Sequence, residues 1–440
     1  MKKIFVIFLT LWFTALSYAQ QAIVPSTALD AYLGNSDATW AWEVRDEYRV
    51  GNTTAYSIFL VSQKWQGILW KHELIVFVPQ EISHDGALLF ITGGSISDGM
   101  PGFARPNSGE STRLASIAER NRAITAMLRQ TPNQPLFGSL HEDALIAFTL
   151  NEFRKDGDYS WPLLFPMAKS AIRSMDVVQE FAQAFTGSVV TRFVISGASK
   201  RGWTTWLAGA TNDPRIVAIA PMVIDILNMP ATLADQQKDY NYSEEIADYV
   251  ELEIPQALHS EFGNALVQMI DPFSYRQRLT MPKMIFMGAN DPYWTIDAIK
   301  HSIYEMPGQN LLCYVANAGH NLGDGQKAFA SLGAFFNLTL NNKLYPACSS
   351  TLSKNSGGIS LEVKINNCQP ERAVLWTAVS NSRDFRQSVW TDKEIEAGTE
   401  INLTIAPPQT GYKAFFVEFF CKDSQGYEYS FTTRAYVTDL

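Results

Sequence analysis

The pattern of apolar positions changes about three quarters of the way along the chain. Before this point, unbroken apolar runs such as 284–287 and 311–315 alternate with longer stretches of helical period. Such runs are typical of strands buried on both faces of a parallel sheet. Beyond it, apolar and polar residues alternate one by one, as at 359–365, which is typical of half-buried antiparallel strands. We therefore predict an α/β domain over residues 20–343 and a β-sandwich of the immunoglobulin or fibronectin type over residues 344–440.

In the first domain, candidate catalytic residues follow several of the predicted strands. The run at 192–196 leads into the turn Gly-Ala-Ser-Lys-Arg-Gly, which places Ser199 immediately before an expected helix. Two later strand runs are followed by Asp291 and then by His320. A serine, an acid and a histidine in this order are typical of the α/β-hydrolase fold. We predict this fold, a mostly parallel sheet flanked by helices, for the first domain.

The three residues suit nucleophilic catalysis of acyl transfer. Ser199 needs a base to take its proton as it attacks, and we expect His320 to be that base. Asp291 would fix the tautomer of His320 and stabilise its protonated form. Asp225 competes for this acid role because some α/β-hydrolases place the acid after the preceding strand. We favour Asp291, since the turn Gly-Ala-Asn-Asp presents it openly.

An oxyanion hole is expected beside the serine. The apolar run at 88–92 ends in Gly93 and Gly94, a loop with exposed N–H groups. We expect these groups, together with the N–H of Lys200, to bind the oxyanion that forms on attack.

Several longer motifs resemble those of a known family. They are Gly-Ala-Ser-Lys-Arg-Gly-Trp-Thr-Thr-Trp at 197–206, Ala-Pro-Met-Val-Ile-Asp-Ile-Leu-Asn at 220–228, Trp-Pro-Leu-Leu-Phe-Pro-Met at 161–167 and Asn-Ala-Gly-His at 317–320. From about Thr27 to about Leu340 the chain resembles the PhoPQ-activated pathogenicity-related protein family. The resemblance implies a secreted, α/β-hydrolase-like protein in which Ser199, Asp291 and His320 are the matching positions. It does not settle the substrate.

Further side chains are candidates for a substrate pocket. Lys200 and Arg201 begin a helix, where the macrodipole disfavours cations. Either a neighbouring carboxylate such as Asp225 offsets their charge, or one of them receives an anionic group of the substrate. The segment around Trp161 starts irregularly because of two prolines, which favours a place beside the site. The candidate pocket residues are Arg201, Asp225, Trp161, His141 and Trp203.

Two further segments concern access to the predicted site and export of the protein. Residues 228–280 show no clean sheet pattern, and an insertion at this position commonly forms a cap over the site. Residues 1–19 have a basic start, a short apolar run and small residues before Gln20, which is typical of a cleaved secretory signal. We therefore expect a secreted or periplasmic protein without a transmembrane segment.

Export makes disulfides possible. The four cysteines are Cys313, Cys348, Cys368 and Cys421. Cys313 lies in a run typical of a buried strand, so we expect it to be a free thiol. One bridge among the other three is expected, and the sequence leaves its pairing open.

Composition excludes several classes of function. Lys and Arg total 35 against 44 acids, giving a net charge of −9, and the chain has no long basic run, so nucleic acid is not an expected partner. It contains no phosphate-binding loop motif, no HExxH and no paired CxxC, and its 6 histidines are scattered. We expect neither a metal nor another cofactor.

These observations favour a secreted serine hydrolase, most readily a carboxylesterase. A peptidase or amidase would use the same residues, and a non-catalytic secreted binding or virulence factor on the same scaffold is a further alternative. The expected ligand is a small ester or peptide. The β-sandwich either packs against the hydrolase or binds glycan or protein through Trp376 and Trp390.

Overall fold

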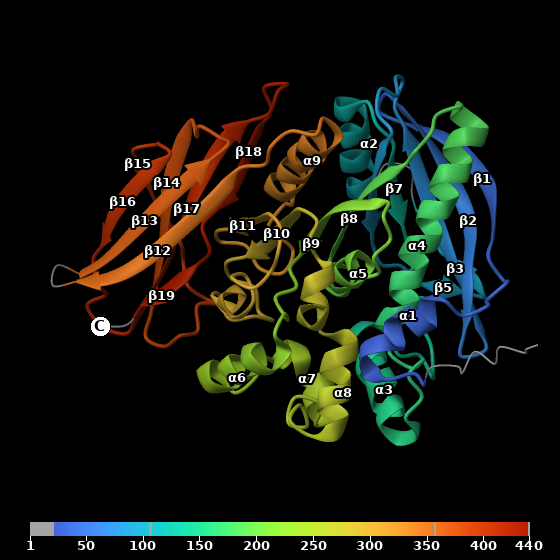
Figure 1. The fold of residues 1–440 in the computed structure, drawn as a ribbon, viewed down its shortest axis with the longest axis horizontal. Coiled ribbons are helices and arrows are strands. Elements are labelled where there is room, and N and C mark those ends of the chain that lie inside the picture. Colours follow the sequence, from blue (N-terminus) through green and yellow to red (C-terminus); the bar gives the residue numbers. More distant parts are fainter. Residues whose placement is uncertain (1–21, 105–107, 356–357, 439–440) are drawn as a thin grey trace, which may run out of the picture.

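The computed structural model describes residues 22–104, 108–355 and 358–438. The predicted signal sequence, residues 1–19, lies outside the described residues. A long mixed sheet runs through the molecule, with helices on both of its faces and a second, smaller sheet at one end (Figure 1).

The first part of this sheet has the strand order of an α/β-hydrolase. The strands β1 to β3 and β7 pair antiparallel in turn, whereas β7, β4, β8, β9, β10 and β11 pair parallel. In spatial order they are β1 (Ala41–Val50), β2 (Thr53–Trp65), β3 (Ile68–Val78), β7 (Thr125–Leu128), β4 (Gly86–Ile91), β8 (Arg192–Ala198), β9 (Ile216–Met222), β10 (Lys283–Gly288) and β11 (Asn310–Val315). A short hairpin, β5 (Ile96–Ser97) with β6 (Met100–Pro101), follows β4.

The order of these strands reverses at β4. The chain passes from β4 to β7 on one side, and then returns to β8 on the other side. In sheets of this kind, sites form at the carboxyl ends of the strands beside such a reversal. The predicted site residues therefore follow β4, β8, β10 and β11 at one end of the sheet.

Helices cover both faces of the sheet because each face carries its own apolar cluster. One cluster joins α4 and α5 to the sheet through residues such as Ala168 and Trp206. The other joins α2 and α9 through residues such as Leu114 and Phe335. These helices are α2 (Gly109–Asn121), α4 (Leu164–Phe181), α5 (Lys200–Gly209) and α9 (Gln326–Leu340), while α1 (Ala28–Leu33) and α3 (Glu142–Asp156) complete this part.

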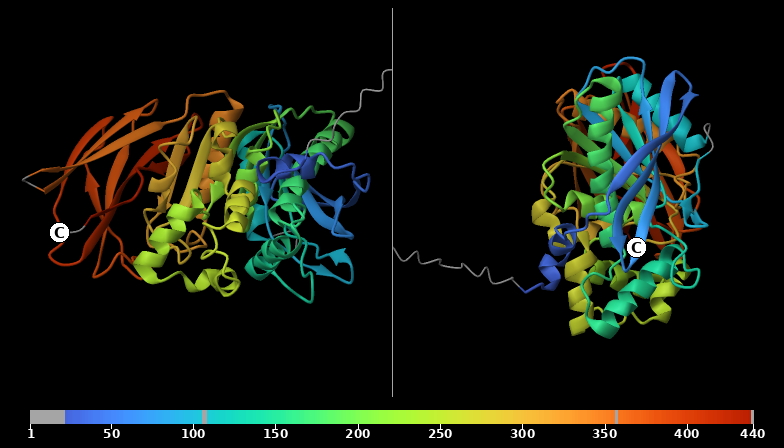
Figure 2. Two further views of the ribbon diagram at one scale, coloured as in Figure 1. Left: turned by 60° about the horizontal axis from the view of Figure 1, so that its bottom comes forward. Right: turned by 90° about the vertical axis from the view of Figure 1, so that its right-hand side faces the viewer.

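The segment between β9 and β10 is helical, where a cap was predicted. It contains α6 (Met229–Tyr240), α7 (Ala247–Glu251) and α8 (Glu261–Ile270), which gather with α3 on one side of the molecule (Figures 1 and 2). Short 3-10 helices lie at Pro25–Thr27 (η1), Glu244–Ile246 (η3), Pro272–Arg278 (η4) and Ala298–His301 (η5), with a π-helical turn at Ala182–Thr186 (η2).

The C-terminal part is the predicted β-sandwich. One layer contains β12 (Ala347–Asn355), β13 (Gly358–Asn366) and β16 (Glu400–Ile405). The other contains β14 (Arg372–Ser380), β15 (Thr391–Ile395), β17 (Tyr412–Lys422), β18 (Glu428–Thr432) and β19 (Tyr436–Thr438). Residues such as Leu361 of the first layer and Val417 of the second pack in one apolar core.

The sandwich also extends the hydrolase sheet. Leu312 of β11 pairs antiparallel with Thr432 of β18, and the hydroxyl of Thr432 accepts a hydrogen bond from the N–H of Tyr314 at 3.2 Å. An edge strand such as β11 would otherwise leave backbone groups unpaired. The sandwich therefore covers this edge, and the left view of Figure 2 shows it at the end of the molecule opposite the blue strands β1 to β3.

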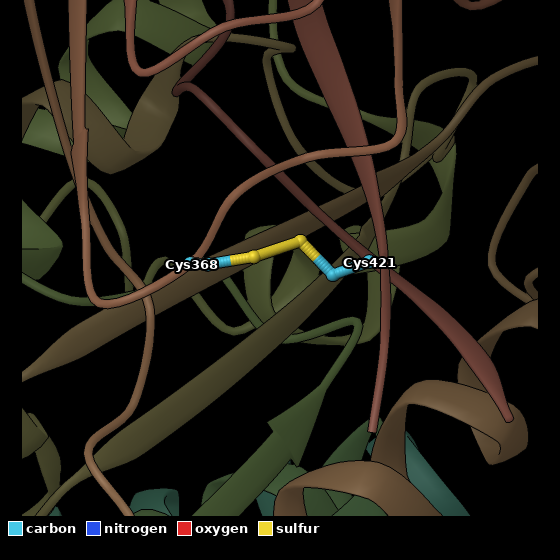
Figure 3. Close-up of a disulfide and its surroundings, with 2 residues drawn as sticks. All are labelled: Cys368 and Cys421. Atoms are coloured by element: carbon cyan, nitrogen blue, oxygen red, sulfur yellow. A yellow bond between two sulfur atoms is a disulfide. The ribbon is translucent and has the colours of Figure 1, made fainter. Parts of the chain in front are cut away.

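One disulfide joins Cys368 to Cys421 within the sandwich (Figure 3). Cys313 is a free, buried thiol, and Cys348 is also free. The prediction of one bridge that leaves Cys313 free is thus confirmed, and the pairing that the sequence left open is settled. In the parts of the chain that the structure describes, no helix is long and apolar enough to cross a membrane.

Candidate active site

Ser199 lies on a sharp turn between β8 and α5. Its backbone has φ 61° and ψ −126°, a conformation that non-glycine residues rarely adopt. The turn requires glycine on both sides. A Cβ on Gly197 would lie 2.8 Å from the carbonyl oxygen of Arg201, and one on Gly202 would lie 2.6 Å from that of Met222. The motif read from the sequence therefore forms the strained strand-to-helix turn that exposes a serine hydroxyl.

His320 and Asp291 are in direct contact. Nδ1 of His320 lies 2.9 Å from Oδ2 of Asp291 and 3.1 Å from Oδ1. Asp291 also accepts a hydrogen bond from the N–H of Tyr293 at 2.9 Å, which helps to fix the carboxylate. Because a carboxylate accepts hydrogen bonds, this contact favours the tautomer with the proton on Nδ1. The Nε2 atom then carries a free lone pair.

Ser199 and His320 line the same pocket. Nε2 of His320 is buried and has no hydrogen-bond partner among the described residues. A buried, unpaired nitrogen is costly, so a group that enters the pocket and donates to it would be favoured. The pocket thus combines a strained serine with a histidine nitrogen that is free to accept a proton.

The walls of this pocket are mainly apolar. Part of the wall comes from the helical segment between β9 and β10. Its role as a cap stays a prediction. The apolar lining residues are Leu150, Trp203, Ile224, Ile226, Met229, Leu233, Ile246, Ile254, Pro255, Ile270 and Trp294.

A polar group on one wall was not predicted from the sequence. The carboxylate of Asp143 accepts hydrogen bonds from the hydroxyls of Tyr249 at 2.9 Å and Tyr293 at 3.1 Å. Nζ of Lys200 lies 2.6 Å from the same carboxylate, and all four residues line the pocket. The ring of Tyr293 lies 4.3 Å from that of His320, measured between centroids. Asp143 lies in the first turn of α3, where an acid also complements the helix dipole.

The two cations that begin α5 are neutralised by the start of α3. The guanidinium of Arg201 binds Glu142 through two hydrogen bonds, of 2.6 and 2.8 Å. Lys200 is paired with Asp143, as described above. The expectation of a neighbouring carboxylate is therefore confirmed, but the suggestion that Asp225 supplies it is wrong.

Asp225 lies in a different environment. It is 3% exposed and lines a small cavity together with Asp291. Burial, aided by the nearby charges of Asp297 and Asp291, raises the pKa of Asp225 to about 8 despite a hydrogen bond from the N–H of Ile299. Asp225 is therefore mostly protonated at neutral pH, whereas Asp291 is the acid that contacts His320.

Of the other predicted pocket residues, only Trp203 lines the pocket described above. Arg201 is held away by Glu142. His141 is exposed at the N-cap of α3, and its side chain makes no capping hydrogen bond. Trp161 packs 6.1 Å from Trp65 between ring centroids and donates a hydrogen bond to Asp156. Aromatic residues near the site in sequence can thus belong to a separate aromatic cluster.

The loop after β4 packs against α5. A Cβ on Gly93 would lie 2.6 Å from a guanidinium nitrogen of Arg201, and one on Gly94 would lie 2.9 Å from the amide nitrogen of Gln130. A Cβ at either position would displace the end of a long side chain, and Gly94 has φ 146°, a conformation that favours glycine. The oxyanion role of Gly93, Gly94 and Lys200 stays a prediction. Among the described residues, no group of three or more His, Cys, Asp or Glu side chains is placed to hold a metal ion.

The raised pKa of Asp225 generates a stability prediction. Between pH 4 and pH 8 the unfolded chain has lost this proton while the folded chain keeps it, so this residue makes wild-type stability fall as pH rises. Asp225→Asn is uncharged throughout. The free energy of unfolding of the variant relative to wild type, measured with urea, should increase from pH 4 to pH 8 and then level off. A difference independent of pH would show that Asp225 is ionised in the folded protein.

Comparisons with known proteins agree with the resemblance read from the motifs. A family model described as PhoPQ-activated pathogenicity-related protein matches residues 29–386. Autocrine proliferation repressor protein A of Dictyostelium discoideum is 31% identical over 449 residues, which cover 93% of this chain and 89% of that protein.

Among solved structures, acetyl xylan esterase 1 from Thermoanaerobacterium sp. is 13% identical, with a TM-score of 0.48 over 72% of this chain and 93% of that chain. A glucuronoyl esterase from Solibacter usitatus is 12% identical, with a TM-score of 0.41 over 72% of this chain and 92% of that chain. The family model matches most of the chain, and the chain therefore belongs to the PhoPQ-activated pathogenicity-related protein family.

Proposed function

We propose that the protein is an exported serine hydrolase that cleaves carboxylic esters. Ser199 is its nucleophile, His320 its general base and Asp291 the partner of His320. The contacts of the two ring nitrogens of His320 are the main support for this proposal. Its Nδ1 is held by Asp291, while its buried Nε2 is unpaired, among the described residues, in the pocket that Ser199 lines.

The chemistry follows from these positions. The hydroxyl oxygen of Ser199 attacks the ester carbonyl as its proton passes to Nε2 of His320. Asp291 stabilises the imidazolium that forms. The N–H groups of Lys200 and of the Gly93–Gly94 loop bind the oxyanion of the tetrahedral intermediate. His320 then gives the proton to the departing alkoxide, and water releases the acyl group from Ser199 by the same steps in reverse.

The pocket favours an apolar substituent next to the reacting carbonyl. Its lining is largely aliphatic and aromatic, and the ammonium of Lys200 is already paired with Asp143. A carboxylate on the substrate would have to compete with Asp143 for that ammonium. Peptide or amide cleavage by the same residues is the alternative within catalysis, since both reactions pass through a tetrahedral intermediate.

Export is part of the proposal. It is supported by the signal-like pattern of residues 1–19 and by the disulfide between Cys368 and Cys421, since such bonds persist mainly in oxidising compartments. The Dictyostelium relative is named as a repressor of proliferation that acts in an autocrine manner. A secreted factor without catalytic activity is therefore the competing function, and turnover separates the two.

The first test compares two carboxyl-to-amide variants. With p-nitrophenyl esters of short apolar acids, Asp291→Asn should lower kcat on the order of 10³- to 10⁴-fold, because His320 loses the partner of its imidazolium. Asp225→Asn, the matched control, should stay within about threefold of wild type, because Asp225 is already mostly uncharged at neutral pH. The reverse result would assign the acid role to Asp225. Absence of turnover by folded wild type would favour the non-catalytic factor.

The second test concerns the charge of the substrate. Wild type should hydrolyse esters of neutral apolar acids at least about tenfold faster, in kcat/KM, than esters of the same length with a terminal carboxylate. Lys200→Gln should not reverse this order, and Arg201→Gln is the control on a cation held by Glu142. If wild type prefers the acidic ester and only Lys200→Gln abolishes that preference, Lys200 receives an anionic substrate group.

A further inference from the structure

The loop between β14 and β15 of the sandwich reaches the α/β-hydrolase part. It spans residues 381–390, and we call it the sandwich loop. Phe385 and Trp390 anchor it, each with 2% of its surface exposed. Asp291 lines a small cavity together with Arg383, Phe385 and Arg386 of this loop. A segment about 90 residues beyond Asp291 in the sequence thus lies beside it.

The sandwich loop binds the residue that precedes Asp291. The side-chain amide of Asn290 donates to the carbonyl oxygens of Ser388 at 2.7 Å, Phe385 at 3.1 Å and Arg386 at 3.3 Å. The backbone N–H of Asn290 donates to the carbonyl of Ala318 at 2.9 Å, which joins the turn after β10 to the turn after β11. The sandwich loop and the turn after β11 therefore both hold Asn290, the residue next to Asp291.

The same loop binds the turn that leads to His320. The side-chain amide of Asn317 donates to the carbonyl of Trp390 at 2.9 Å, and its oxygen accepts from the N–H of Trp390 at 2.8 Å. Asn317 has φ 54°, in the left-handed region, so the backbone bends sharply three residues before His320. This reciprocal pair holds that bend against the sandwich.

A third attachment reaches the segment between β9 and β10. The guanidinium of Arg383 pairs with Asp239 of α6 at 3.1 Å and with Asp297 at 2.9 Å. The guanidinium of Arg386 lies 4.2 Å from the ring centroid of Tyr240. The sandwich loop thus contacts the turns after β10 and β11 and the helix α6 that follows β9.

We infer that the sandwich loop positions Asp291 and His320, with Asn290 and Asn317 as the positioning residues. The inference rests on the proposed function, since it assigns these side chains to the geometry of that same site. The hydrogen bond between Asp291 and His320 joins two separate turns, so its length depends on what holds both of them. Misplacement of reacting groups by about 1 Å costs on the order of 10²-fold in rate. The sandwich is accordingly part of the catalytic framework.

The test uses the full chain and three variants. Asn317→Ala removes the reciprocal pair with Trp390, and Asn290→Ala removes the three bonds to the sandwich loop. Thr377→Ala is the matched control, because it removes a side-chain hydrogen bond to Thr391 on the β14–β15 hairpin itself. Thermal unfolding shows that each variant is folded at the assay temperature.

Two readouts separate positioning from stability. In ester hydrolysis, Asn290→Ala and Asn317→Ala should lower kcat by about tenfold to a hundredfold with KM within about twofold of wild type. The resonance of the Nδ1–H proton of His320, followed by NMR and assigned with His320→Gln, should move upfield, since a longer hydrogen bond to Asp291 deshields this proton less. Tyr293, Lys200 and Asp143, which line the same pocket as His320, are unchanged in these variants. Thr377→Ala should match wild type in both readouts, and Asn317→Asp, which keeps the acceptor for Trp390, should recover part of the loss.

Folded Asn290→Ala and Asn317→Ala proteins with wild-type kcat and an unshifted Nδ1–H resonance of His320 would overturn the inference. If wild type hydrolyses the ester and both asparagine variants match it in kcat, the proposed function stands and only the positioning role is rejected. If wild type shows no turnover, the proposed function fails, and the Nδ1–H resonance of His320 alone decides whether the sandwich loop aligns Asp291 and His320.

Discussion

The hydrogen bond between Asp291 and Nδ1 of His320 depends on the whole sheet. Asp291 follows β10 and His320 follows β11, and these two strands pair in parallel with Gly288 opposite Val315. Parallel pairing brings the ends of both strands to one edge, which is also the edge where β8 delivers Ser199. Strands buried on both faces hold that edge, because a slip in register would expose their apolar side chains.

The cations beside the pocket are paired with carboxylates of the same chain. The acids that begin α3 neutralise the cations that begin α5, so the helix that follows Ser199 can begin with Lys200 and Arg201. The pocket beside this helix is lined mainly by apolar side chains. Each of these charges is paired at hydrogen-bond distance, and removal of one partner would leave a largely buried, unpaired charge, which is strongly destabilising.

Much of the fold could be predicted from the sequence, because period and turn residues are local properties. The apolar runs marked β8, β10 and β11 correctly, and the motif around Ser199 marked the strained turn. The contact between Asp291 and His320 followed from their order after successive strands.

The side-chain partners could not be predicted in the same way. The contact of Asp143 with Tyr249 joins residues 106 positions apart, and that of Asn317 with Trp390 spans 73 positions. No local pattern encodes such pairs, which exist only once helices and loops are placed. The same reason explains two errors. From the sequence, Asp225 at the end of the next strand is one candidate partner for the cations of α5, and the irregular segment around Trp161 favours a place beside the pocket.

The central claim is that Ser199 is an activated nucleophile, and reaction with a fluorophosphonate tests it most directly. The purified protein is treated with the probe, and the adduct is located by peptide mass spectrometry beside a Ser199→Ala control. The account predicts one adduct per chain on Ser199 and none in the control. A folded wild-type protein that forms no adduct on Ser199 would contradict it.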